Sequence, residues 1–124
     1  MGSGNLAVAA RSSQNFAECL RSDTLHPMAY LIQQTKTFAN WHSAVRDLKA
    51  KVAIARRIDR AAAGNLGDVK SVGDGVSEMR IDVGAGYRLY FTVRGGIVIV
   101  LLVGGDKSTQ PADIRQAKKL AKEV

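Results

Sequence analysis

The feature that most constrains this chain is a pair of alternating segments, 79–83 and 87–93, joined by a short glycine-containing loop. Apolar residues occupy every second position in both segments, and strand side chains alternate between faces with the same period. The loop Gly84-Ala85-Gly86 has the backbone freedom that a tight hairpin needs. A register that places Val83 opposite Tyr87 puts both apolar sets on one face of a sheet and the polar side chains on the other.

This register predicts a polar face that carries two arginines and a phenol. Guanidinium groups bind phosphate through paired hydrogen bonds and stay charged, so a face of this kind suits phosphate. We therefore regard Arg80, Arg88 and Tyr90 as candidate site residues on an open face. In the alternative interpretation, Arg88 only forms a surface pair with Asp82, worth about 0.2–1 kcal/mol. The predicted cross-strand pairs are Asp82 with Arg88, Arg80 with Tyr90, and Glu78 with Thr92.

Charge and length indicate one small basic domain. The 124 residues carry a formal net charge of +7, and the charges within residues 1–27 cancel, so the excess lies in 28–124. Such a balance favours an anionic partner, nucleic acid first, and charge kept for solubility is the alternative. The single cysteine, Cys19, excludes an internal disulfide and fits a reducing compartment. With no apolar run of membrane-spanning length, we expect a cytoplasmic protein without membrane contact.

The domain is predicted to occupy residues 28–124. Residues 1–27 are small, polar and only weakly periodic, so we treat them as an N-terminal appendage without an assigned role. A short strand pattern begins at Met28. Next come two helices, of which the first has Thr37 as a candidate N-cap and the second ends at Gly64-Asn65. The first apolar stripe contains Phe38, Trp41, Val45 and Leu48, and the second contains Ile54, Ile58, Ala61 and Ala62.

A basic ridge is predicted on the second helix. At about 100° per residue, Lys49, Arg56 and Arg60 fall opposite its apolar stripe. These side chains either contact RNA or simply form a solvated helix face, and the residues alone leave both interpretations open.

The remaining elements complete an α+β pattern. A short segment at 68–72 precedes the hairpin, and the run 97–103 is apolar throughout, as in a strand buried on both faces. The last helix starts at Pro111. The order is therefore strand, two helices, three or four antiparallel strands, helix. We expect the helices to pack on one side of a curved sheet.

The motif order resembles the RelE/ParE superfamily of bacterial toxins, and more closely its HigB-type, phage Gp49-like addiction module killer proteins. The resemblance covers about residues 28–122 and does not reach 1–27. The matching segments are 64–81, 86–91, 101–110 and 113–118.

The resemblance implies a RelE/ParE-like fold, with an antiparallel curved sheet, two N-terminal helices and a C-terminal helix. It also implies the toxin of a type II toxin–antitoxin system that cleaves mRNA on the ribosome and is sequestered by a helix-turn-helix, HigA-like antitoxin. Operator DNA would be met only through the antitoxin complex. Alternatives within this group are a ParE-like gyrase inhibitor and a non-toxic antitoxin-binding module, since superfamily membership alone does not determine the target.

By the same resemblance, Arg88 contacts the scissile phosphate, Arg80 is a base or phosphate ligand, and Lys107 stabilises charge or the leaving group. The residues themselves suggest two further roles. Tyr90, facing Arg80, would stack a base or relay a proton, with an ordinary half-exposed sheet tyrosine as the alternative, and Lys70 would follow the RNA backbone. The dull alternatives are a solvated strand residue for Arg80 and a turn residue for Lys107, where Asp106 would cap the last helix. Neither a metal nor a cofactor is expected, so the predicted activity is that of a metal-independent endoribonuclease.

The sequence does not identify a general acid or a general base for this reaction. His26 lies in the appendage and His42 on the first helix, so the chain lacks the histidines that some HigB relatives use at the site. Tyrosine and lysine have ordinary pKa values well above neutrality, so they are poor proton carriers unaided. This favours a site completed by the ribosome and its mRNA.

Overall fold

The computed structural model describes residues 29–124, and the predicted appendage and its boundary at Met28 lie outside this part of the chain. It is a mixed α+β structure with a five-stranded sheet and three α-helices within the described residues. The elements are β1 (Leu31–Gln34), α2 (Lys36–Ala44), α3 (Leu48–Ala62), β2 (Val69–Gly73), β3 (Val76–Ile81), β4 (Tyr87–Arg94), β5 (Val98–Asp106), the 3-10 turn η1 (Lys107–Thr109) and α4 (Gln110–Ala121).

The sheet confirms the predicted order of elements. Its strand order is β1-β5-β4-β3-β2, and β2 to β5 form a continuous antiparallel series. The expected sheet is antiparallel throughout, but β1 pairs with β5 in parallel, with Leu31 opposite Val98. The sheet is therefore antiparallel except at this edge, and β5 is an interior strand.

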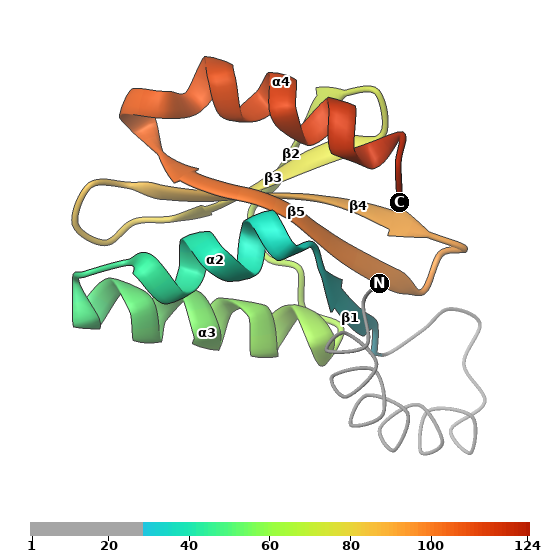
Figure 1. The fold of residues 1–124 in the computed structure, drawn as a ribbon. Helices are drawn as coiled ribbons and strands as arrows, with labels where there is room; N and C mark the ends of the chain where they lie inside the picture. Colours follow the sequence, from blue (N-terminus) through green and yellow to red (C-terminus); the bar gives the residue numbers. More distant parts are fainter. Residues whose placement is uncertain (1–28) are drawn as a thin grey trace.

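The helices cover both faces of the sheet, so the expectation that they pack on one side is wrong. Figure 1 shows α2 and α3 on one face and α4 on the other. One core cluster, which includes Phe38, Ile54 and Leu89, lies under α2 and α3, and a second, which includes Leu102 and Ala117, lies under α4. The apolar run in β5 supplies the reason, because alternate residues of such a strand need cover on opposite faces.

The hairpin register also differs from the prediction. Ile81 lies opposite Tyr87, and Arg80 lies opposite Arg88, so the strands are shifted by two residues and the connection is longer. The N–H of Gly86 closes it by donating to the carbonyl of Val83 at 3.1 Å. A shift of two keeps every side chain on its predicted face, whereas a shift of one would not. The faces were predicted correctly, and the cross-strand partners were not.

Helix α2 follows β1 directly, and its N-cap is Thr35 rather than the predicted Thr37. The Oγ1 atom of Thr35 accepts a hydrogen bond from the Phe38 N–H at 3.0 Å and donates to the Leu102 carbonyl at 2.7 Å. The second bond ties the cap to β5, which local sequence does not reveal. Leu48 was expected in the apolar stripe of this helix, but it begins α3 and is 72% exposed.

Candidate functional site

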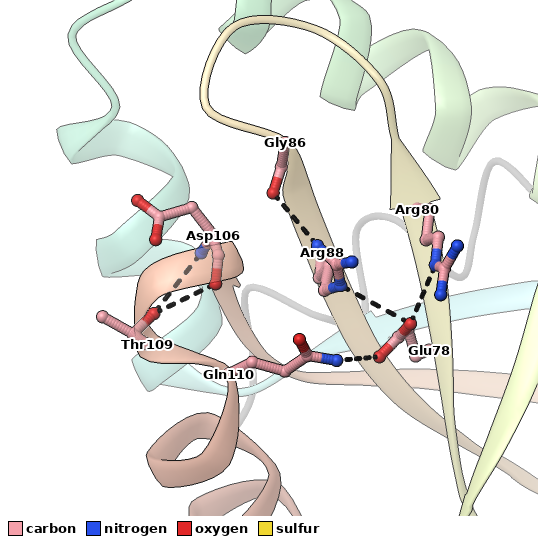
Figure 2. A network of polar contacts seen from close by, with 7 residues as sticks. All are labelled: Glu78, Arg80, Gly86, Arg88, Asp106, Thr109 and Gln110. Atoms are coloured by element: carbon pink, nitrogen blue, oxygen red, sulfur yellow. Dashed lines mark hydrogen bonds and ion pairs between the residues drawn. The ribbon is translucent and has the colours of Figure 1, made fainter.

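A buried carboxylate lies at the centre of the candidate site. The side chain of Glu78 is 1% exposed, and its Oε2 atom lies 3.2 Å from Nε of Arg80 and 3.5 Å from Nε of Arg88. The Gln110 amide donates to its Oε1 atom at 3.1 Å. Figure 2 shows this cluster, which we call the Glu78 cluster: Glu78, Arg80, Arg88 and Gln110.

The strands and α4 explain why these four residues meet. Arg80 and Arg88 are direct cross-strand partners, and Glu78 precedes Arg80 by two positions, so all three share one sheet face. Gln110 is the first residue of α4, which packs over the same face. Sequence reasoning missed Glu78 and Gln110 as site residues. The available signal was an acidic residue two positions from a candidate arginine within one strand.

The two guanidinium groups face the carboxylate through Nε. The Arg88 side chain is 11% exposed and its Nη1 donates to the Gly86 carbonyl at 3.4 Å, whereas the Arg80 side chain is 44% exposed. Two cations placed opposite each other on a sheet repel, and the carboxylate between them offsets that repulsion. The result is a pair of arginines held together by one carboxylate, with Arg80 open to solvent and Arg88 mostly covered. Two adjacent guanidinium groups are an arrangement suited to a phosphate group.

Lys107 lies beside the loop between β3 and β4, just before Arg88. It is exposed in η1, directly after β5, and a Cβ atom built at Gly86 would lie 3.3 Å from Cγ of Lys107. The Lys107 side chain therefore lies near Gly86, whose carbonyl accepts the Arg88 hydrogen bond. Asp106 accepts a hydrogen bond from the Ser108 N–H at 2.8 Å and so caps η1, and its bonds with Ser108 lower the pKa of the Asp106 carboxyl.

Tyr90 is not on an open face, so that part of the prediction is wrong. Its side chain is fully buried in the cluster under α4, where its hydroxyl finds no hydrogen-bond partner among residues 29–124. Burial, assisted by the nearby carboxylates of Glu78 and Asp113, raises the pKa of Tyr90 to about 12. The sequence placed this residue on the correct side of the sheet, but it did not reveal that α4 covers that position.

Tyr90→Phe is expected to change the alkaline stability of the protein. Because the folded pKa of Tyr90 is raised from 10.0 to about 12, its stabilising contribution is complete below pH 10 and is lost as the pH rises through about 12. The free energy of unfolding of wild type should therefore fall relative to Tyr90→Phe over this range, measured by urea denaturation. At pH 7 the variant should lie within about 1 kcal/mol of wild type, since it removes an unpaired hydroxyl.

Tyr30→Phe, at a partly buried tyrosine, is the control for the loss of a tyrosine hydroxyl. Identical pH profiles for wild type and Tyr90→Phe would show that Tyr90 titrates as freely in the folded protein as in the unfolded chain.

The predicted RNA-binding residues fall into two separate groups. Lys70 is exposed on β2 and lies opposite Glu78, so it shares the face of the Glu78 cluster. Lys49, Arg56 and Arg60 are exposed on α3, which covers the opposite face. The structure confirms that these three form an exposed ridge and separates them from Arg88. RNA contact at all four positions stays a prediction.

A second carboxylate, that of Asp113 in α4, lies close to this face. Thr109 Oγ1 donates to Asp113 Oδ2 at 2.5 Å, and burial raises the pKa of Asp113 despite that bond. Within residues 29–124, no three His, Cys, Asp or Glu side chains are grouped so that they could hold a metal ion.

The described residues thus form a mixed α+β fold in which two arginines meet a buried carboxylate on one face of the sheet. Comparison with known proteins identifies the family of the chain. The chain belongs to the phage-derived Gp49-like (DUF891) family, whose model matches residues 44–123, a RelE/HigB-type addiction module killer family.

A Haemophilus influenzae relative, described as an uncharacterized protein, is 52% identical over 97 residues, which are 78% of this chain and 98% of the relative. No solved structure matches the chain. None of the helices in the described part of the chain has the length and apolar character needed to cross a membrane.

Proposed function

We propose that this chain is the toxin of a type II toxin–antitoxin system and that it cleaves mRNA engaged on the ribosome. The family suggests a toxin module and implies an antitoxin partner, which we take to be of the helix-turn-helix kind. The observation that carries the nuclease proposal is the Glu78 cluster, in which one buried carboxylate holds the solvent-exposed Arg80 and the mostly covered Arg88 together.

The cluster suits the charge that develops during RNA cleavage. The 2′-oxygen forms a bond to phosphorus while the bond to the 5′-oxygen breaks, and extra negative charge gathers on the non-bridging oxygens. In our proposal the terminal nitrogens of Arg80 and Arg88 bind these oxygens, since their Nε atoms already face Glu78. Lys107, whose side chain lies near Gly86, stabilises the phosphorane or protonates the leaving 5′-oxygen.

Removal of the 2′-hydroxyl proton is assigned to the ribosome complex rather than to this chain. Tyr90 is buried with a pKa of about 12, and His42 belongs to α2 on the opposite face of the sheet. Binding on the ribosome would also align the 2′-oxygen, phosphorus and leaving oxygen, a positioning effect that supplies much of the rate in such reactions.

Arg88→Lys is expected to lower the rate of mRNA cleavage by about 100-fold, because lysine keeps the charge but lacks the planar fork that binds two phosphate oxygens. Retained charge opposite Glu78 makes this variant a better test than Arg88→Ala, which leaves the buried carboxylate with one partner fewer. Cleavage is measured by primer extension on a reporter mRNA in a reconstituted translation reaction.

Lys119→Ala, at an exposed position of α4, is the matched control and should cleave like wild type. Full cleavage by Arg88→Lys and by Arg80→Ala would refute the site. Intact transcripts together with inhibited DNA supercoiling would support a gyrase inhibitor instead. Normal growth on overexpression would support a non-toxic antitoxin-binding module.

A further inference from the structure

A second surface lies between α3 and the end of β3. It is a groove of about 740 Å³, and its walls come from α3 on one side and from residues 80–83 on the other. Two large aliphatic side chains of α3 line it while remaining open to solvent: Leu48 is 72% exposed and Val52 is 45% exposed. They are four residues apart, so they lie one turn apart on the same side of the helix.

The rim of this groove is strongly basic. Lys49, Arg56 and Arg60 from α3 and Arg80 from β3 all line it, whereas Asp82 is the one carboxylate among its described lining residues. The groove therefore combines exposed aliphatic surface with a positive border. Neither property is needed to hold the fold together, since the core side of α3 is formed by other residues of that helix, such as Ile54 and Ala61.

We propose that this groove binds an acidic amphipathic segment of a partner protein. Apolar side chains of that segment would lie on Leu48 and Val52, and its carboxylates would face Arg56 and Arg60. A helix or strand with one apolar face is the form of peptide that such grooves bind, and complementary charge selects the partner.

RNA fits the groove less well. Single-stranded RNA is bound by aromatic side chains on which bases stack, and none of the described lining residues is aromatic. The aliphatic side chains of Leu48 and Val52 cannot hydrogen-bond to phosphate, and covering them with a charged RNA backbone would not stabilise the complex. The basic ridge of α3 is thus assigned to a protein partner.

Arg80 connects the groove with the Glu78 cluster. Pairing of β2 with β3 ends at Met79, which lies opposite Val69, so Arg80 follows at an unpaired edge of the sheet. Arg80 is one of the residues that line the groove, and its side chain contacts Glu78 at 3.2 Å. A carboxylate bound in the groove would compete with Glu78 for Arg80 and would place negative charge beside the phosphate site. This link between docking and inhibition rests on the proposed function.

Binding is tested with the full chain and a defined probe. The probe is a fluorescein-labelled, 16-residue helical peptide with leucines four positions apart and glutamates flanking them, and binding is followed by fluorescence anisotropy. Wild type should bind it saturably, and Val52→Asp and Arg56→Glu should each weaken binding at least tenfold. Both positions are exposed, so folding should be unaffected, which circular dichroism checks.

The matched controls are Val93→Asp, at an exposed valine on β4, and Arg115→Glu, at an exposed arginine on α4, and both should bind like wild type. Three outcomes would overturn the docking proposal. They are absence of saturable binding, equal binding by groove and control variants, and stronger binding of a 16-nucleotide RNA that Arg56→Glu abolishes while Val52→Asp leaves it unchanged.

The inhibitory link is tested in the mRNA cleavage assay. The peptide should reduce cleavage by wild type and should have little effect on Val52→Asp, which keeps the Glu78 cluster intact. Peptide that binds without reducing cleavage would refute the role of Arg80 as the link. A chain that binds the peptide but cleaves no mRNA would refute the nuclease and leave the docking site standing, so the two failures are distinguishable.

Discussion

Replacing Glu78 with alanine is expected to lower the free energy of unfolding by about 3–5 kcal/mol, the usual cost of removing one partner from a buried ion pair. The carboxylate is 1% exposed and contacts two arginines, of which Arg88 is itself only 11% exposed. Arg80 can turn toward solvent, because its side chain is 44% exposed, but Arg88 cannot do so without opening the sheet face. The amide of Gln110 loses its acceptor as well.

Urea denaturation followed by circular dichroism measures this loss, with two variants for comparison. Glu78→Gln keeps the shape and one acceptor oxygen, so it should be less destabilised than Glu78→Ala. Glu123→Ala removes an exposed carboxylate at the C-terminus and should stay within about 0.5 kcal/mol of wild type. If Glu78→Ala is as stable as Glu123→Ala, the arginines do not depend on the buried carboxylate. The proposed preorganisation of the phosphate site would then fail.

Gly104→Ala is expected to cost at least about 3 kcal/mol, at or above the upper end of the usual range for overpacking. A Cβ atom at this position of β5 would lie 2.2 Å from Cε3 and 2.3 Å from Cζ3 of Trp41. The indole of Trp41 packs against the core and lies 5.6 Å from the ring of Phe38, measured between ring centroids, so it has little room to move. Either α2 must shift from the sheet or β5 must bend.

A double-mutant cycle identifies the cause of this loss. If contact with the indole is responsible, Trp41→Leu should recover part of the stability of Gly104→Ala, giving a positive coupling between the two positions. Thermal unfolding and urea denaturation both report it. Losses that simply add would place the cost of Gly104→Ala elsewhere, for instance in the backbone of β5.

A side chain at the adjacent position, Gly105, is excluded by a different neighbour from the one at Gly104. A Cβ atom at Gly105 would lie against the carboxylate of Asp113 on α4, the opposite side of the sheet. The two glycines therefore allow a helix to approach β5 closely on each face. Strand β5 continues through both glycines to Asp106. The close approach of a helix on each face explains why both positions are glycine.

The periodicity of the sequence determined on which face of the sheet the side chains of β3 and β4 lie. Alternation in β3 and β4 correctly assigned Met79 and Leu89 to one face and Arg80 and Arg88 to the other, because a strand has only two faces. The continuous apolar run correctly predicted an interior strand. The order of motifs predicted the family, to which a matching family model assigns the chain.

Tertiary structure decided what covers each face and which residues meet there. The two-residue shift in register leaves the alternation unchanged, so the pairing of Arg80 with Arg88 could not be distinguished from the predicted pairing by pattern alone. Helix α4 buries Tyr90 and brings Gln110 to Glu78. Periodicity reports the direction in which a side chain points, but burial and partners depend on segments distant in sequence that pack against it.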